Sequence, residues 1–222
     1  MNLREGYQEP APTVGFELAS PKGIPGVSGL KALYYIAVVL PSAQADAVKT
    51  LQHRAHTAYH SRAALRSPPH ITLRAPFRLP LDQVGGLKQV LTEFASSYPP
   101  FSVELGGFGC FPPRVVFVRV IENQMLSAIQ HDLIKTLTEN QIVGSGEQAL
   151  RAFHPHITIA FRDLIQHHFR SLWGEVEHKS FVDRFTAGGI TLLRHNGKIW
   201  AAEADFLFGQ KEFDVRTRKL EK

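Results

Sequence analysis

The sequence predicts an α+β protein with antiparallel sheets, on three observations. Strand-like segments alternate with amphipathic helical segments, but some strands follow one another directly, which disfavours a purely parallel sheet. Asn196-Gly197 separates two such consecutive strands and predicts a hairpin. The phrase Pro-His-apolar-Thr-apolar occurs twice, at residues 69–73 and 155–159, and together with the repeated element order indicates an internal duplication.

The first half of the chain predicts strand, helix, strand and helix in turn. Residues 33–40 are rich in Tyr and Val and end at a proline, which is typical of a buried strand. Ser42 is a candidate N-cap for a helix over 43–59. The first repeated phrase begins a strand over 70–77, and apolar residues at helical spacing predict a helix over 83–96.

The middle of the chain predicts two strands and a helix. The strands are expected at 101–105 and 115–121, and the glycines and prolines between them indicate an irregular connection. Residues 126–137 place their apolar side chains on one side of a helix. A loop is expected over 145–152, before the second phrase.

The last part of the chain predicts strand and helix again, and then three strands. The second phrase begins a strand over 156–161, and a helix is expected over 164–173. The final strands are expected at 181–185, 189–194 and 198–208, and the last two are joined by the hairpin turn.

Both ends of the chain are expected to lie outside a single domain, which we place at residues 30–209. Residues 1–29 are rich in Gly and Pro and predict an extension that wraps the domain or stays loose. Because this segment has no apolar stretch of the signal-peptide kind, we do not expect a secretory signal. Residues 210–222 are expected to form a charged tail.

Composition restricts the class of protein. An apolar content of 44% is ordinary for a globular protein with a core, and no apolar run approaches the length of a membrane span. Cys110 is the only cysteine, which excludes an internal disulfide and Cys-rich zinc sites, and it makes the cytoplasm the expected compartment. The net charge of +5 is compatible with an anionic substrate but too mild to identify one.

Each copy of the repeated phrase offers one imidazole and one hydroxyl to the same face of a strand, because side chains two positions apart share a face. The pairs are His70 with Thr72 and His156 with Thr158. Histidine titrates nearest neutral pH, so two imidazoles can act as base and acid, and Thr hydroxyls can donate hydrogen bonds to phosphoryl oxygens. Facing pairs would suit in-line attack on a phosphate ester with no metal or cofactor.

Five further residues are candidate substrate contacts. Arg74 and Arg162 stand on the same strand faces as the histidines if the strands continue unbroken, and would bring positive charge to a phosphate. Phe77 and Phe161 follow the phrases and are candidates for stacking on a base, with core packing as the alternative. Of two adjacent tyrosines that face opposite sides of their strand, we take Tyr35 to line the cleft.

The repeated His-x-Thr-apolar phrase resembles the signature of the two-histidine (2H) phosphoesterases, which include 2'-5' RNA ligase-like proteins and RNA cyclic phosphodiesterases. The resemblance spans residues 30–209, and the stretches YYIAVVLP and GGFGCFPPRVVFV are similar to the bacterial branch. It implies a bilobal, pseudo-two-fold fold in which two antiparallel sheets flank a central cleft, with helices outside. It also implies that His70 and His156 are the acid–base pair and that Thr72 and Thr158 hold the phosphate.

Other kinds of site fit less well. His154 and His156 share a strand face and could hold zinc, but no carboxylate at suitable spacing supports this. A histidine-triad hydrolase needs a third His where this chain has Thr158. The sequence has neither Gly-x-Ser-x-Gly nor Gly-x-x-x-x-Gly-Lys, and Cys110 lies among Phe and Gly as an expected core residue.

Three functions remain open on the sequence. The first is hydrolysis of 2',3'-cyclic phosphates at RNA ends or on nucleotides, and the second is ATP-independent 2'-5' joining of RNA ends at the same site. The third is a module that binds RNA ends without turnover. We expect RNA ends or cyclic nucleotides as the binding partner, no membrane, no obligate protein partner and a monomer.

Overall fold

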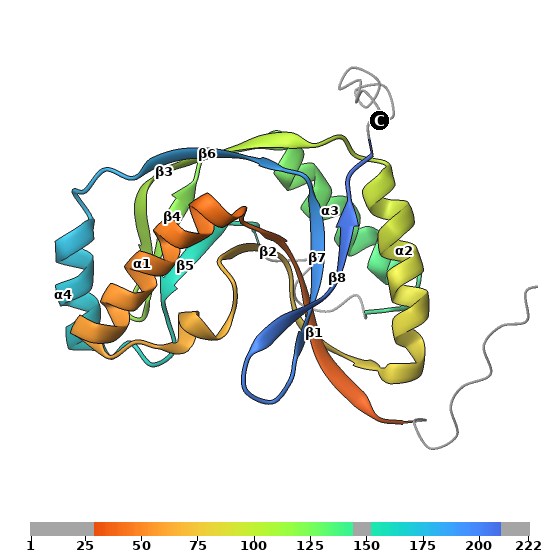
Figure 1. Cartoon of the computed structure of the whole chain (residues 1–222), viewed down its shortest axis with the longest axis horizontal. Helices are drawn as coiled ribbons and strands as arrows, with labels where there is room; N and C mark the ends of the chain where they lie inside the picture. Colours follow the sequence, from red (N-terminus) through yellow and green to blue (C-terminus); the bar gives the residue numbers. More distant parts are fainter. Residues whose placement is uncertain (1–28, 144–151, 210–222) are drawn as a thin grey trace, which may run out of the picture.

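The computed structural model describes residues 29–143 and 152–209, in which the strands form two antiparallel sheets of four (Figure 1). This confirms the α+β class with two antiparallel sheets. The strands are β1 (Lys31–Val39), β2 (His70–Pro80), β3 (Phe101–Phe111), β4 (Val115–Val120), β5 (His156–Ala160), β6 (Val182–Ala187), β7 (Gly189–His195) and β8 (Trp200–Leu207).

The two strands that carry the repeated phrase occupy equivalent places in the two sheets. One sheet has the order β2-β1-β7-β8 and the other has the order β5-β4-β3-β6. Both β2 and β5 therefore lie at an edge, and each pairs antiparallel with one neighbour, β1 or β4. The two edge strands also contact each other, which brings the two phrases to one place in the molecule.

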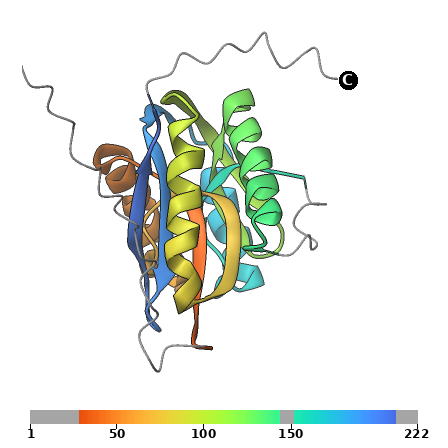
Figure 2. The ribbon, with the colours of Figure 1, turned by 90° about the vertical axis from the view of Figure 1, so that its right-hand side faces the viewer.

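Of the helices described, two pack on the sheet of the other lobe, and two stay with the sheet whose strand they follow. They are α1 (Ser42–Tyr59), α2 (Val84–Ser96), α3 (Gln124–Glu139) and α4 (Gln166–Val176), with short 3-10 turns η1 (Ala63–Arg66) and η2 (Leu81–Gln83). Helix α1 follows β1 of one sheet but packs on β5 of the other, next to α4 (Figure 1). Reciprocally, α3 follows β4 but packs on β2, and α2 lies beside it (Figure 2).

Strand alternation determines which side chains face the core. In β2 the buried positions include Ile71 and Leu73, and in β5 they include Ile157 and Ile159. The His and Thr of each phrase occupy the intervening positions, so they face away from that core. The predicted amphipathic helix is confirmed as α3, whose buried side chains are Leu126, Ile129, Leu133 and Leu137.

The glycine-rich stretch after residue 105 is not the irregular connection that the sequence predicts, because β3 continues through it to Phe111. The pairing of β3 with β4 shifts register between Leu105 and Phe108, and Gly107 adopts a φ of +68° in this bulge. A Cβ atom at Gly109 would lie 2.4 Å from the ring of Phe117. The glycines therefore permit a bulge and a close ring contact within a strand.

Some boundaries also differ from the predicted ones. Ser42 is the first residue of α1 rather than its cap, and within residues 29–143 and 152–209 no side chain caps that helix. Strand β2 runs on to Pro80, and η1 was not predicted. Among the helices of the described residues, none is long and apolar enough to cross a membrane. All but the last residue of the predicted extension over 1–29, most of the predicted loop and the tail over 210–222 lie outside the described residues.

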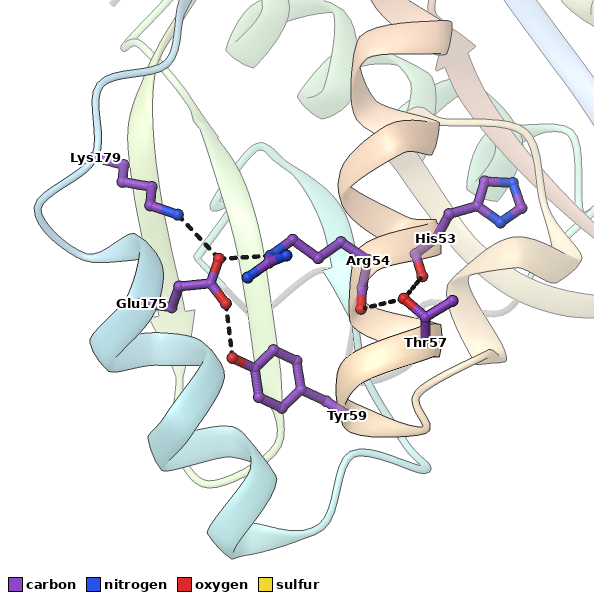
Figure 3. Close-up of polar contacts among 6 residues, drawn as sticks. All are labelled: His53, Arg54, Thr57, Tyr59, Glu175 and Lys179. Atoms are coloured by element: carbon purple, nitrogen blue, oxygen red, sulfur yellow. Dashed lines mark hydrogen bonds and ion pairs between the residues drawn. The ribbon is translucent and has the colours of Figure 1, made fainter.

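A carboxylate on α4 links the end of α1 to that helix (Figure 3). Glu175 accepts hydrogen bonds from Arg54 Nε at 2.6 Å, from the Tyr59 hydroxyl at 2.7 Å and from Lys179 Nζ at 2.9 Å. The hydrogen bond from Arg54 is the main reason why the pKa of Glu175 falls to about 2. The network holds α1 against the lobe that it covers.

Replacing Glu175 by glutamine should lower the free energy of unfolding near neutral pH by about 1–2 kcal/mol, because charge-assisted bonds are lost but Arg54 and Lys179 are half exposed. A carboxyl whose pKa is depressed in the folded state stabilises that state above its ordinary pKa. The contribution disappears as the pH falls from about 4.5 towards 2. Urea unfolding of wild type and variant across this range tests both statements.

Glu139→Gln is the matched control, because Glu139 lies 3.8 Å from Lys135 with both side chains largely exposed. We expect this variant to change the unfolding free energy by less than about 0.5 kcal/mol. If both substitutions changed the free energy of unfolding equally, the α1–α4 network would contribute no more to stability than an ordinary surface ion pair.

Candidate active site

A cavity of about 710 Å³ lies where the two phrase-bearing strands approach each other. His70 and Thr72 of β2 line it, and so does Thr158 of β5. His156 is not among the lining residues, but its charge acts on His70, so the two imidazoles are close enough to interact electrostatically. The structure therefore brings three of the four predicted residues to the cavity and the fourth close to His70.

Both imidazoles are oriented by the same kind of hydrogen bond. His70 Nδ1 lies 2.6 Å from the carbonyl oxygen of Pro68, and His156 Nδ1 lies 2.6 Å from the carbonyl oxygen of His154. A carbonyl oxygen can only accept, so each Nδ1 carries a hydrogen and donates it. The Nε2 atom of each neutral ring is then left with a lone pair, as a proton-transfer group requires.

The proline in each phrase explains this local geometry. Pro69 and Pro155 stand between each histidine and the residue whose carbonyl it contacts. A residue that precedes proline is restricted to extended conformations, which limits the directions in which its carbonyl can point. The repeated Pro-His order thus favours the same imidazole orientation at both places.

An aromatic ring from the neighbouring strand packs on each imidazole. The ring of Tyr35 in β1 lies 4.8 Å from His70, and the ring of Phe117 in β4 lies 4.8 Å from His156. Phe111 also contacts His156, edge to face at 5.2 Å. The hydroxyl of Tyr35 forms a hydrogen bond with the hydroxyl of Ser67, the residue directly before Pro68. These rings fix the imidazoles and shield them from water.

Burial lowers the pKa of His70 to about 4, and the nearby His156 adds to the shift. Burial also lowers the pKa of His156, with a smaller part due to His154. In both cases the protonated imidazole loses the water that would stabilise its positive charge, and the free site does not offset this loss. Both imidazoles are therefore mainly neutral near pH 7 in the free protein, and an anion between them would favour protonation.

The two threonine hydroxyls are available to a ligand. Across residues 29–143 and 152–209, neither hydroxyl has a hydrogen-bond partner. Thr72 lies opposite Ala37 and Thr158 lies opposite Phe117 in the strand register. The main-chain oxygen of Thr158 accepts a 2.9 Å hydrogen bond from the buried side chain of Gln52 in α1. This bond fixes β5 against the helix that crosses from the other sheet.

The sequence that builds this site matches a known protein family. The model of the 2'-5' RNA ligase superfamily matches residues 40–199. The chain belongs to this superfamily of two-histidine phosphoesterases. It is 30% identical over 158 residues, 69% of this chain and 86% of the relative, to a protein of Geobacillus thermodenitrificans (strain NG80-2) that bears the name "Putative phosphoesterase". A Bacillus pumilus (strain SAFR-032) protein of the same name is 27% identical over 65% of this chain and 81% of its own length.

Solved structures show the same 2H phosphoesterase fold. TT0787 of Thermus thermophilus is similar with a TM-score of 0.60 and 23% identity, over 81% of this chain and 100% of that one. E. coli LigT complexed with 3'-AMP gives a TM-score of 0.60 and 18% identity, over 81% and 99%. At these identities the likeness concerns the fold, and it confirms the bilobal architecture.

Three of the further predicted contacts line the cavity of this 2H phosphoesterase. They are Tyr35, Phe161 and Arg162. Strand β5 ends at Ala160, and Arg162 has a φ of +58°, so it reaches the cavity through a turn rather than by strand alternation. Its guanidinium lies over the ring of Phe161 at 5.1 Å.

The structure does not place Phe77 and Arg74 on the cavity wall. Phe77 shares the core face with Ile71 and Leu73 and is 7% exposed, so core packing is its role. The β1–β2 pairing shifts register around Ile36, opposite Arg74, and the Arg74 guanidinium lies 5.6 Å from the Phe77 ring. The prediction for Arg74 assumes a regular strand, and the β1–β2 pairing is irregular at this residue.

The zinc alternative gains no support. In the part of the chain that the structure describes, no three His, Cys, Asp or Glu side chains are grouped to hold a metal ion. His154 is exposed and contributes its carbonyl oxygen to His156. Cys110 packs against the core, as expected from its neighbours.

Sequence reasoning missed part of the cavity wall. Ser67 could have been found, because it directly precedes Pro-Pro-His. The hairpin turn at Asn196-Gly197 also predicts that the residues on either side of the turn pair across two strands. Nothing in the sequence indicates that α1, η1 and the β7–β8 hairpin reach the site. The missed lining residues with polar or aromatic side chains are Gln52, His56, His60, Arg62, Arg66, Ser67, Asp163, His195 and Trp200.

Proposed function

We propose that the protein hydrolyses 2',3'-cyclic phosphates at RNA ends or on nucleotides, with no metal in the reaction. The observation that carries this proposal is the pair of matched Nδ1–carbonyl hydrogen bonds, because they leave two Nε2 atoms for proton transfer. LigT, which has the same fold, has been solved with 3'-AMP, one of the two nucleotides that opening of such a ring yields.

The proposed reaction uses the four residues as follows. One imidazole Nε2 takes a proton from water as the oxygen of that water bonds to phosphorus. The other, protonated, gives its proton to the 2' or 3' oxygen as the ring P–O bond breaks. The hydroxyls of Thr72 and Thr158, with Arg162, hold the non-bridging oxygens, where negative charge is stabilised.

Turnover in chelator tests the proposal. The substrates are a nucleoside 2',3'-cyclic phosphate and a short RNA with a cyclic phosphate end, each in EDTA, with and without a second RNA that carries a 5'-hydroxyl. We expect acyclic 2'- or 3'-phosphates as products. Joined RNA through a 2'-5' bond would instead favour ligation, since the 5'-hydroxyl takes the place of water at the same site. Binding without either product would favour an RNA-end binding module.

The pH dependence follows from the buried imidazoles. Catalysis needs one imidazole neutral and one protonated, and this state is most populated between the two pKa values of the pair. Both values lie below the ordinary 6.5 because burial disfavours the charged form. We therefore expect kcat/KM, which reports the free enzyme, to peak below pH 6.5 and to fall as the pair loses its last proton. A profile from about pH 4 to about pH 9 with a maximum above 7 would contradict this.

A further inference from the structure

Three arginines line the cavity beside η1. Arg62 directly precedes this turn, Arg66 ends it, and Arg162 follows β5. The carboxylate of Asp163 accepts hydrogen bonds from the Ser61 hydroxyl at 2.9 Å and from the main-chain N–H of Arg62 at 3.0 Å. These bonds hold the turn after β5 against η1, which gathers the three arginines at one wall.

The three guanidinium groups have no ion-pair partner among the described residues. Within residues 29–143 and 152–209, none of Arg62, Arg66 and Arg162 forms an ion pair with a carboxylate. All three residues are exposed at the rim of the cavity. A guanidinium presents a planar set of donors that matches a phosphate with two bonds, so this rim is suited to an anion.

A second feature of the same cavity points to a polar ligand. Among the residues that the structure describes, Gln52 Oε1 and His56 Nδ1 are buried atoms without a hydrogen-bond partner, and both residues line the cavity one helical turn apart on α1. The Gln52 amide nitrogen already donates to the carbonyl of Thr158, and Gln52 is 3% exposed, so its Oε1 can only accept a bond from outside. Buried polar atoms are nearly always paired, and a ligand hydroxyl or N–H would pair this one after a small movement of the Gln52 side chain, because the oxygen has almost no accessible surface.

We infer that Arg62 and Arg66, at the η1 side of the cavity, form a second anion subsite next to Arg162, and that the substrate is a 2',3'-cyclic phosphate carrying a further phosphate on its 5' side. This class comprises oligonucleotide ends and 5'-phosphorylated nucleotides, and it excludes the bare nucleoside cyclic phosphate as the preferred substrate. The inference rests on the proposed hydrolysis for its catalytic part. A cavity of about 710 Å³ is large within the range of about 300–1,000 Å³ for small-molecule sites, so there is room beyond the cyclic ring.

The test compares adenosine 2',3'-cyclic phosphate with the same compound bearing a 5'-phosphate, in EDTA. We expect the wild type to have a kcat/KM about 10- to 100-fold higher for the 5'-phosphorylated compound, mainly through KM, because charge-assisted bonds to phosphate give about this much. The ratio should fall towards one in Arg62→Gln and Arg66→Gln and at high salt. Arg170→Gln on α4, an exposed arginine that is not part of the cavity wall, is the control and should keep the wild-type ratio.

A binding measurement separates this inference from the proposed function. If neither compound turns over, the hydrolysis proposal fails, and calorimetric titration with adenosine 3'-phosphate and adenosine 3',5'-bisphosphate decides the subsite. A preference of at least about tenfold for the bisphosphate that Arg62→Gln and Arg66→Gln remove would support the second anion subsite. Equal kcat/KM or equal affinity in the wild type would overturn it, and so would a preference that both arginine variants retain.

Discussion

Replacing either His70 or His156 with glutamine should lower kcat for cyclic phosphate hydrolysis by about 10²–10⁴-fold, the usual contribution of a general acid or base. Glutamine removes the titratable Nε2 that the Nδ1–carbonyl bond leaves for proton transfer. The two imidazoles act on one proton-transfer sequence, so the double variant should lose little more than the worse single one. Single-turnover and steady-state rates in EDTA measure these losses.

His131→Gln on α3 is the matched control, because His131 is exposed and does not line the cavity. It should keep wild-type rates, and all three variants should keep a cooperative thermal transition. Wild-type kcat in either His70→Gln or His156→Gln would remove that imidazole from the mechanism.

Gly109→Ala should lower kcat by about 10- to 100-fold without touching a substrate contact, because a small misplacement of a catalytic group costs this much. The new Cβ would lie 2.4 Å from the Phe117 ring, which is 7% exposed and packs on His156 at 4.8 Å. The ring is also held by Phe111 at 4.6 Å, so it has little room to retreat without displacing the imidazole. The measurement is kcat together with the thermal midpoint.

Gly85→Ala is the control for the added methyl group. Within the described residues a Cβ at Gly85 meets nothing within 4 Å, and the residue is the second of α2, where alanine is the better helix former by less than the roughly 1 kcal/mol of a helix interior. This variant should be as active as wild type and slightly more stable. A Gly109→Ala variant with wild-type kcat would show that Phe117 does not position His156.

The sequence predicted the elements whose side chains follow a strict period. The His and Thr of each phrase share a face because strands alternate, and α3 buries the apolar side that its spacing indicates. The side-chain period gives the wrong face or element where the backbone departs from regular geometry. The register shift around Ile36 leaves Arg74 off the cavity wall, and the glycines of β3 allow a strand where they were expected to interrupt one.

The rest of the site could not be predicted because it depends on how distant elements pack. Gln52 and His56 lie on α1, whose amphipathic pattern predicts only that one side is buried, not that β5 is its partner. Arg62 and Arg66 reach the cavity because Asp163, far along the chain, holds η1 in place. No local pattern encodes such a contact.

The crossed positions of α1 and α3 amount to a domain swap within one chain. Each sheet contributes one edge strand with a repeated phrase, and that strand is covered by a helix that follows a strand of the other sheet, so either half alone would expose the apolar face of its edge strand to water. Neither lobe can then be removed or unfolded while the other keeps its core. The site is present only in the fully folded chain. Both imidazoles therefore lose their positions in the same unfolding transition.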